Sequence, residues 1–451
     1  MGCFTCSIPI PQTAALVVVF VLKKIYGYSH KNVVNFIIFV VITIKNMINR
    51  EIYTKRLLKF IDKPFIKVLT GLRRSGKSSI LLMLKDELQR RGVASENIIQ
   101  INFESFAYAD IQNASHLYDF IKKKILNTQT YYILLDEIQE IDSWEKALSA
   151  FMVDFKVDLY ITGSNAKLLS SELATYLSGR YIEMDIYPLS FSESLTFKQS
   201  RYPQTTFHPK SEFEHFLRLG GFPTLHTSSY DMDSAYKIVY DIYSSAILRD
   251  TVQRYNIRDV ELLERVVKYI FDNIGNNFSA KNVADYFKSQ QRKIDLNTVY
   301  NYLQALSSAF IIYRVSRYDI KGKEILKTQE KYYLGDQAIL YAVMGYKDRL
   351  IAGVLENIVY LELRRRNYKV YVGKMGNKEI DFIAALNEKK IYVQVAYKLQ
   401  EQSTIDREFG SLMAIQDNFP KYVVTMDPLW VDNHGGIQHV FIADFLLMID
   451  Y

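Results

Sequence analysis

A glycine-rich loop that ends in a lysine and a serine is the clearest chemical signal in this sequence. Residues 71–78 match the pattern G-x-x-x-x-G-K-S/T, with an apolar run at 64–70 before them and a helical pattern at 80–91 after them. Such a loop folds closely round a phosphate, which the N–H groups of the loop and of the following helix can bind. We therefore expect a nucleotide-binding site that includes Gly71, Arg73, Arg74, Ser75, Gly76, Lys77, Ser78 and Ser79.

Charged and hydroxyl groups near this loop predict catalysis as well as binding. Lys77 places a positive charge at the β- and γ-phosphates, and the hydroxyl of Ser78 is a ligand for Mg²⁺. Asp136 and Glu137 follow the apolar run 130–135, where the first carboxylate can hold the magnesium shell and the second can polarise an attacking water. An acidic pair often simply opens a helix, but the upstream loop favours the catalytic assignment.

Two further residues are candidates for contact with the transferred phosphate. Asn165 follows the strand-like run 158–163 and would reach the γ-phosphate from a neighbouring strand, although Ser164 and Asn165 suit a helix N-cap equally well. Arg180 is a candidate trigger arginine that stabilises the transferring phosphoryl group. The alternative for Arg180 is a helix C-terminal arginine beside the capping residue Gly179.

Four apolar runs alternate with helical patterns over this half of the chain. The runs are 64–70, 97–103, 130–135 and 158–163. This alternation predicts an α/β fold in which a parallel sheet has helices on both faces and binds its ligand at the carboxyl ends of the strands. The fold class that we expect is therefore a P-loop NTPase sheet.

Taken together, these motifs resemble the prokaryotic AAA+-type ATPases that carry a C-terminal domain of uncharacterised function. The resemblance starts near Met47, reaches the C-terminus and excludes residues 1–46. It implies ATP binding and hydrolysis with ATP and Mg²⁺ as the ligands, but no settled cellular task. The segments that support this resemblance are Gly71–Ser78, Leu135–Gln139, Ile161–Asn165, Ser178–Arg180, Pro188–Phe191, Gly220–Pro223 and Leu248–Asp250.

The middle of the chain predicts a helical lid and then a winged helix. Residues 191–255 have helical patterns, and two helices at 279–288 and 295–306 precede a basic hairpin, which is the winged-helix plan. Such a module binds DNA, or serves as a spacer or a protein dock. In the DNA-binding case the contacting residues would be Asn297, Thr298, Tyr300, Asn301, Lys321 and Lys323.

The last hundred residues have the spacing of a restriction-endonuclease-like fold with an incomplete site. Glu356 lies in a helical segment, and Asp381 lies in a strand-like run as the one firm acid. Gln394 stands where a second carboxylate is expected, and Ala396 stands where a lysine is expected. Lys398 cannot simply substitute, because it lies two residues further along the strand. A neutral amide binds Mg²⁺ weakly, so we expect this fold to be inactive as a nuclease.

Composition separates a short leader from the rest of the chain. The 451 residues include 56 Lys and Arg against 49 Asp and Glu, a net charge of +7, and the four lysines of residues 1–46 face no acid there. Both cysteines also lie in the leader, which excludes a disulfide scaffold, a cysteine nucleophile and a thiolate zinc site in the body. The nearly balanced body has no electrostatic footprint of a nucleic-acid-binding protein.

The leader contains two apolar runs, 14–22 and 36–44, each too short for a membrane helix. We expect a start codon assigned too early, with Met47 as the initiator, and hold a weak membrane anchor as the alternative. We accordingly expect a cytoplasmic protein without stable membrane insertion. The expected units are residues 1–46, an ATPase core at 47–190, a lid at 191–255, a winged helix at 256–335 and the nuclease-like fold at 336–451.

The resulting functional hypothesis is an ATP-driven switch that engages DNA or a partner protein, with a homo-oligomer also open. Two alternatives remain at this point. One is an ATP-gated nuclease, which Gln394 and Ala396 argue against. The other is a nucleotide-binding interaction protein with little turnover, in which ATP orders the lid.

Overall fold

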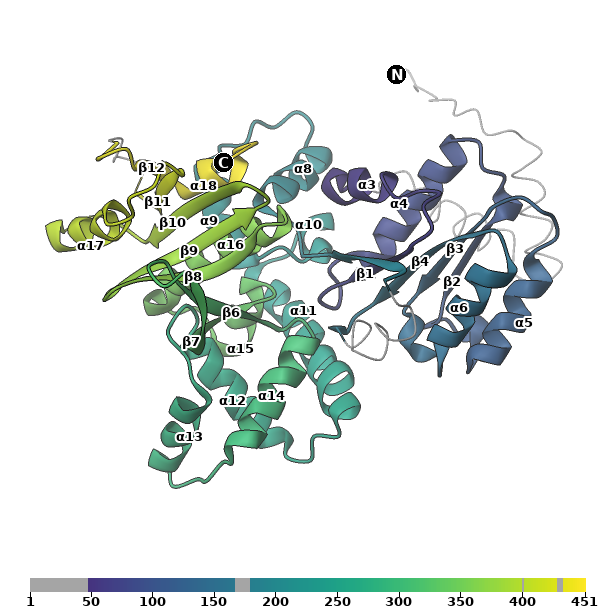
Figure 1. Cartoon of the computed structure of the whole chain (residues 1–451), viewed down its shortest axis with the longest axis horizontal. Coiled ribbons are helices and arrows are strands. Elements are labelled where there is room, and N and C mark those ends of the chain that lie inside the picture. Colours follow the sequence, from purple (N-terminus) through teal and green to yellow (C-terminus); the bar gives the residue numbers. More distant parts are fainter. Residues whose placement is uncertain (1–47, 167–178, 400, 428–432) are drawn as a thin grey trace, which may run out of the picture. The chain divides into compact units, whose positions relative to one another are not determined.

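A five-stranded parallel sheet carries the nucleotide-binding motifs in the computed structural model (Figure 1). The structure describes residues 48–166, 179–399, 401–427 and 433–451, so the leader 1–46 lies outside the described residues. The strand order is β2-β3-β4-β1-β5, and every neighbouring pair is parallel. The strands are β1 Ile66–Thr70, β2 Ile98–Asn102, β3 Tyr131–Asp136, β4 Val157–Gly163 and β5 Tyr181–Asp185.

Helices cover both faces of this sheet because its strands bury side chains on both sides. Ile133 and Leu135 of β3 pack in one core cluster with the helices α5 and α6, whereas Tyr132 and Leu134 pack in another with α3 and α4. This confirms the fold class predicted from the alternation of strands and helices. The helices are α3 Glu51–Leu58, α4 Lys77–Arg90, α5 Ala114–Lys124 and α6 Trp144–Asp154, with short 3₁₀ turns at Ser95–Asn97, Phe106–Tyr108 and Ile138–Glu140.

A run of helices follows β5 without an intervening strand. The first of them, α8, begins with a capping box in which Ser190 and Glu193 satisfy each other's backbone N–H groups. The segment named η5 is a π-helix that continues directly from α11. The bounds are α8 Phe191–Arg201, α9 Pro209–Leu219, α10 Pro223–Thr227, α11 Met232–Ser245, η5 Ala246–Gln253, α12 Val260–Asp272, α13 Ala280–Ser289 and α14 Leu296–Ser308.

A mixed seven-stranded sheet forms the C-terminal part of the chain. Its order is β12-β11-β10-β9-β8-β6-β7, and the strands are β6 Ile312–Asp319, β7 Glu324–Leu334, β8 Lys369–Met375, β9 Lys378–Leu386, β10 Lys389–Ala396, β11 Lys421–Thr425 and β12 Gln438–Phe441. The accompanying helices are α15 Gln337–Met344, a 3₁₀ turn at Asp348–Leu350, α16 Ile351–Arg365, α17 Gln402–Met413 and α18 Ile442–Leu447.

The hairpin expected in a separate module at 256–335 is the edge of this second sheet. β6 pairs in parallel with β8, and β7 is the outermost strand. One core cluster also joins Val239 of α11, Val267 of α12, Leu306 of α14 and Val359 of α16. The segments that the sequence divides at 255/256 and 335/336 thus share a sheet and a core. Among the described residues, no helix is both long and apolar enough to cross a membrane.

Candidate nucleotide-binding site

The glycine-rich loop joins the carboxyl end of β1 to the start of α4, as the motif predicts. Gly71 has a φ of 146°, and a Cβ atom there would lie 2.1 Å from the carbonyl oxygen of Ile186. Gly76 has a φ of 99°, a conformation that other residues rarely adopt. Both glycines are therefore required by the path of the backbone, which turns the first N–H groups of α4 toward the loop.

Lys77 is buried at the centre of this loop. Its Nζ donates to the carbonyl oxygens of Gly71, at 3.0 Å, and Leu72, at 3.2 Å. Burial lowers the pKa of Lys77, while the nearby carboxylates of Glu137 and Asp136 act in the opposite direction. The lysine and the two acids that the sequence predicts to work together thus lie close enough to interact electrostatically.

Asp136 and Ser78 form the side of the site that suits a magnesium ion. Asp136 is the last residue of β3, and its carboxylate accepts a hydrogen bond from the hydroxyl of Thr162. Burial raises the pKa of Asp136, and hydrogen bonds from Thr162 and Ser78 partly offset that increase. An anionic oxygen beside a serine hydroxyl is the donor set that Mg²⁺ uses with a nucleotide.

Glu137 is held in an unusual backbone conformation next to Asp136. Its φ is 56°, and its N–H donates to the Thr162 hydroxyl at 2.9 Å. The carboxylate is buried and accepts a hydrogen bond from the amide of Gln139. Left-handed backbone in a non-glycine residue is costly and is often found at functional sites. Thr162, which the sequence analysis did not single out, therefore orients both acids.

The remaining loop residues have different environments. Arg73 Nη2 lies 2.6 Å from Glu104 Oε1, and its Nη1 lies 3.8 Å from Asp250 Oδ2. Arg74 is exposed, and Ser79 is half-buried in the first turn of α4. Ser75 is fully buried. The contacts of Arg73 with Glu104 and Asp250 place this side chain among the acids of the site.

Asn165 is also brought to this site, together with an acid from η5. Asn165 is fully buried, and its Nδ2 donates to the backbone oxygen of Asp250 at 3.3 Å. Ser164 Oγ donates to Asp250 Oδ1 at 3.1 Å. In the sequence, Asp250 belongs to the family motif 248–250, which predicts no role for it. The local pattern does not mark Asp250, because residues 246–253 contain both apolar and polar side chains.

Arg180 is the one candidate that the structure does not bring together with the others. Its carbonyl oxygen accepts from the N–H of Ile66, so it lies beside the amino end of β1, whereas the glycine-rich loop follows the carboxyl end. Five residues of parallel strand separate the two ends, which is roughly 16 Å. This backbone position does not support a contact between Arg180 and the nucleotide of its own chain, and its role as a trigger arginine stays a prediction.

Arg50 is a residue that the sequence analysis missed entirely. It is 2% exposed, and its Nη1 donates to the carbonyl oxygen of Ser75 at 2.8 Å. Its Nη2 donates to the carbonyl oxygen of Tyr187 at 2.9 Å, and its Nε and Nη2 both bind Glu193. The guanidinium thereby ties the glycine-rich loop to the end of β5 and to the start of α8.

The charges of the site favour a nucleotide that carries a divalent cation. Two cations, Arg73 and Lys77, face three buried acids, Asp136, Glu137 and Asp250, which is a net charge of −1 when all are ionised. A free nucleotide would add negative charge to a site that is already negative. A magnesium ion at Ser78 and Asp136 would make the net charge of the site positive. The donor set therefore fits a magnesium–nucleotide complex.

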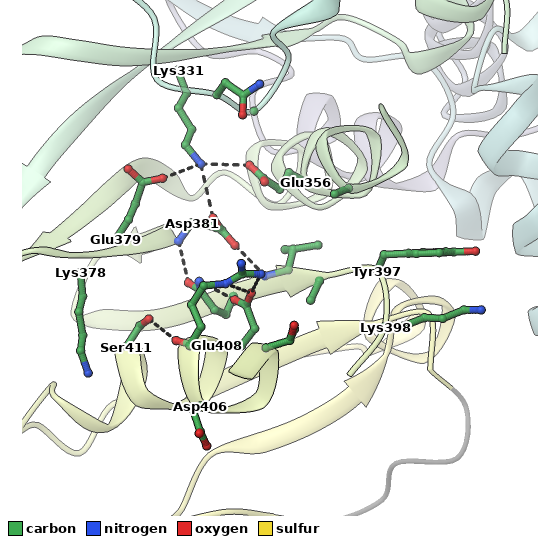
Figure 2. Close-up of a pocket in the computed structure, with 18 of the residues that line it drawn as sticks. Lys331, Glu356, Lys378, Glu379, Asp381, Tyr397, Lys398, Asp406, Glu408 and Ser411 are labelled. Atoms are coloured by element: carbon green, nitrogen blue, oxygen red, sulfur yellow. Dashed lines mark hydrogen bonds and ion pairs between the residues drawn. The ribbon is translucent and has the colours of Figure 1, made fainter. Parts of the chain in front are cut away.

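A second group of charged side chains lines a cavity of about 920 Å³ in the C-terminal part (Figure 2). Lys331 Nζ lies 3.0 Å from Glu379, 3.3 Å from Glu356 and 3.4 Å from Asp381. Burial raises the pKa of Glu356 to about 8 against the opposing effect of Lys331. Lys331 of β7 was not predicted, because no local motif connects it to β9.

Gln394 and Ala396, at which the sequence predicts an incomplete nuclease site, both line this cavity. Gln394 of β10 accepts from the N–H of Asp381 at 2.9 Å and donates to Glu408 of α17 at 2.8 Å. Ala396 is buried in the cavity wall, and the exposed Lys398 lines the cavity further along. Within the described ranges, no group of three or more His, Cys, Asp or Glu side chains could hold a metal ion.

Comparison with known proteins assigns the chain to a family. A family model described as an AAA domain matches residues 63–195, and a domain of unknown function (DUF8612) matches residues 210–350. An uncharacterized protein of Haemophilus influenzae is 40% identical over 408 residues, which cover 89% of this chain and 99% of that protein. The chain belongs to the same family as this protein. An uncharacterized protein of Methanocaldococcus jannaschii is 31% identical over 364 residues, which cover 79% of this chain and 78% of that one.

The region of this chain that matches the AAA domain covers the whole five-stranded sheet. Residues 63–195 include β1 to β5, the glycine-rich loop and both carboxylates at the end of β3. Among solved structures, the Walker-type ATPase of Pyrococcus abyssi is 17% identical with a TM-score of 0.47, over 66% of this chain and 95% of that one. The family match thus identifies residues 63–195 as an AAA domain with a P-loop.

Proposed function

We propose that this chain binds ATP with Mg²⁺ and hydrolyses it to ADP and phosphate. The observation that carries the proposal is the convergence of Lys77, Ser78, Asp136 and Glu137 at one edge of the first sheet. Each of these groups has the chemistry that phosphoryl transfer to water requires. The AAA domain match over the same residues supports it.

Each side chain has a distinct proposed role. Lys77 and the N–H groups of the loop bind the β- and γ-phosphates, for which Lys77 exchanges its present contacts with the loop carbonyls. Ser78 and Asp136 hold the magnesium ion, which neutralises charge on the phosphates. Glu137 orients and polarises the attacking water, and the buried amide of Asn165 contacts the γ-phosphate. Arg73 is a further phosphate ligand, as the loop motif predicts.

We further propose that nucleotide turnover changes the helical lid and a surface that binds DNA or a protein. In support, Asn297, Tyr300 and Asn301 of α14 are exposed, with Tyr300 at 59%. Lys321 and Lys323 are exposed in the turn between β6 and β7. The N–H of Phe278 also donates to the carbonyl oxygen of Glu330, which adds a short bridge to that hairpin, as in a winged helix.

Two measurements test this function against its alternatives. Calorimetric titration with ATP and Mg²⁺ tests binding, with Lys77→Ala as the reference for loss of the site. Steady-state phosphate release, measured with and without double-stranded and single-stranded DNA, separates a turning-over switch from an interaction protein that binds ATP with little turnover. Stimulation by DNA would identify the partner class, whereas the absence of ATP binding by the wild-type chain would refute the proposal.

A further inference from the structure

Asp250 is the acid of the nucleotide site that the proposed function leaves without a role. It is 3% exposed and comes from η5 of the lid rather than from the first sheet. One carboxylate oxygen, Oδ1, accepts from Ser164 at 3.1 Å. The other oxygen, Oδ2, has no hydrogen-bond partner among the described residues and lies 3.8 Å from Nη1 of Arg73.

We propose that Asp250 is a specificity-determining residue that competes with the γ-phosphate of ATP for Arg73. This inference rests on the proposed function, because it assumes that the loop binds a nucleotide. Without nucleotide, Arg73 is shared by Asp250 and Glu104. When a γ-phosphate is present, the guanidinium binds it in a charge-assisted contact, and Asp250 loses its nearest counter-ion.

Burial makes this competition strong. Glu104 is 37% exposed, so water can screen its charge when Arg73 leaves. Asp250 is almost completely buried and cannot be screened in that way, so the loss of Arg73 is costly even though Arg254 also stabilises its carboxylate. This cost arises only when a γ-phosphate binds. Asp250 therefore lowers the affinity for ATP relative to the affinity for ADP, instead of weakening the binding of both nucleotides equally.

The position of Asp250 also connects this competition to the lid. Asp250 lies in a π-helix, an uncommon conformation that is frequent at functional sites. Its neighbours Ile247 and Thr251 are buried, and η5 packs against α14, the helix with the exposed Tyr300. Displacement of Asp250 from Arg73 would therefore act on the same helix that we propose to contact a partner.

Substitution of Asp250 by asparagine tests the inference directly. Asparagine keeps the size of the side chain and an oxygen that can accept from Ser164, but removes the negative charge. We expect Asp250→Asn to bind ATP at least about tenfold more tightly than the wild type, with a smaller gain for ADP, since a unit charge a few ångströms from a phosphate contributes more than that factor at low screening. Asp241→Asn removes an exposed acid of α11 and should change neither affinity.

Hydrogen exchange gives a second, independent readout. In the wild type we expect ATP, but not ADP, to change the hydrogen-exchange rates of amides 246–253. In Arg73→Gln we expect this change to disappear, although Lys77 still binds the nucleotide. This second variant remains informative if Asp250→Asn does not fold. Equal affinities of wild type and Asp250→Asn for ATP, or an unchanged exchange response in Arg73→Gln, would overturn the inference alone. A wild-type chain that does not bind ATP would instead refute the proposed function.

Discussion

Arg50 and Glu193, which are 143 residues apart, form a two-pronged ion pair with both N···O distances at 2.8 Å. Although burial alone would raise it, the pKa of Glu193 lies below its usual value, because Arg50 stabilises the carboxylate. The same guanidinium holds the carbonyl oxygen of Ser75 in the glycine-rich loop. Glu193, the partner of Ser190 in the capping box of α8, is thereby linked through one side chain to the proposed phosphate site.

Glu193→Gln should lower the free energy of unfolding by about 3 kcal/mol, because it leaves the buried charge of Arg50 without its partner. Glutamine preserves the capping geometry, so the loss reports the ion pair rather than the helix cap. Urea denaturation followed by circular dichroism would measure the change. Glu51→Gln, which disrupts an exposed pair with Lys55, should cost less than about 0.5 kcal/mol. Equal effects of the two substitutions would contradict this prediction.

Lys77→Ala should weaken ATP binding on the order of 100-fold, because it removes the positive charge at the centre of the loop and leaves mainly N–H dipoles. Isothermal titration calorimetry with ATP and Mg²⁺ would measure the loss. Arg90→Ala is the matched control, since Arg90 is an exposed cation at the far end of the same helix. An unchanged affinity in Lys77→Ala would show that the nucleotide binds elsewhere.

Glu137→Gln should keep ATP affinity close to that of the wild type but slow hydrolysis by about 10²- to 10⁴-fold, the usual contribution of a general base. The amide preserves the shape of the side chain and can still accept from Gln139, but it cannot polarise the water as a carboxylate does. Single-turnover phosphate release would measure the rate. Glu140→Gln, at a more exposed acid three residues on, is expected to turn over normally. Rapid hydrolysis by Glu137→Gln would place the base on another residue.

The first sheet could be predicted because each of its signals is local. The apolar runs that form β1, β3 and β4 are buried on both faces, and a strand of that kind is visible in the sequence as a mainly hydrophobic stretch. The motif of the glycine-rich loop is also local, since all of its residues lie within positions 71–78. The direction of a parallel strand is also local information, and it places Arg180, which precedes β5, at the amino ends of the strands rather than at the carboxyl ends.

The missed residues depend on contacts between distant segments. Arg50 reaches Glu193, Asp250 reaches Arg73, and Lys331 reaches Asp381, and in each pair only the fold brings the partners together. The union of the β6–β7 hairpin with β8 is of the same kind, because α15 and α16 separate these strands in the sequence. Periodicity predicts that an element exists, but not which edge of a sheet it joins.

Glu356 should make the stability of the chain fall as pH rises. Burial raises the pKa of Glu356 to about 8, whereas the unfolded chain has an ordinary carboxyl pKa near 4.5. Between these values the folded state holds one proton more, so stability is lost as pH rises from about 5 to 8, by up to about 1.4 kcal/mol per pH unit. Denaturation of Glu356→Gln and of the wild type across this range would measure the effect. The free energy of unfolding of the variant should increase relative to that of the wild type as the pH rises. Glu388→Gln, at an exposed acid, should follow the wild-type curve.

The cavity around Asp381 should be silent as a nuclease, because its carboxylates are already committed within the chain. Lys331 occupies the space between Glu356, Glu379 and Asp381, and Asp381 Oδ2 accepts from the N–H of Val395 at 2.8 Å. Glu408, the nearest substitute for a second acid, is bound by Gln394 and Arg407. A divalent ion would have to displace these partners before it could activate a water.

Purified protein with ATP and either Mg²⁺ or Mn²⁺ should therefore leave supercoiled plasmid and single-stranded DNA intact. The lost contributions of the second carboxylate and the lysine correspond to a rate reduction on the order of 10³-fold or more each. Gel electrophoresis over several hours would detect nicking well below an ordinary enzymatic rate. Asp381→Ala is the necessary comparison, because a contaminating nuclease would cleave equally in both preparations. Cleavage by the wild type that disappears in Asp381→Ala would show that Lys331 and Glu408 complete the site after all, and would make an ATP-gated nuclease the better account of this chain.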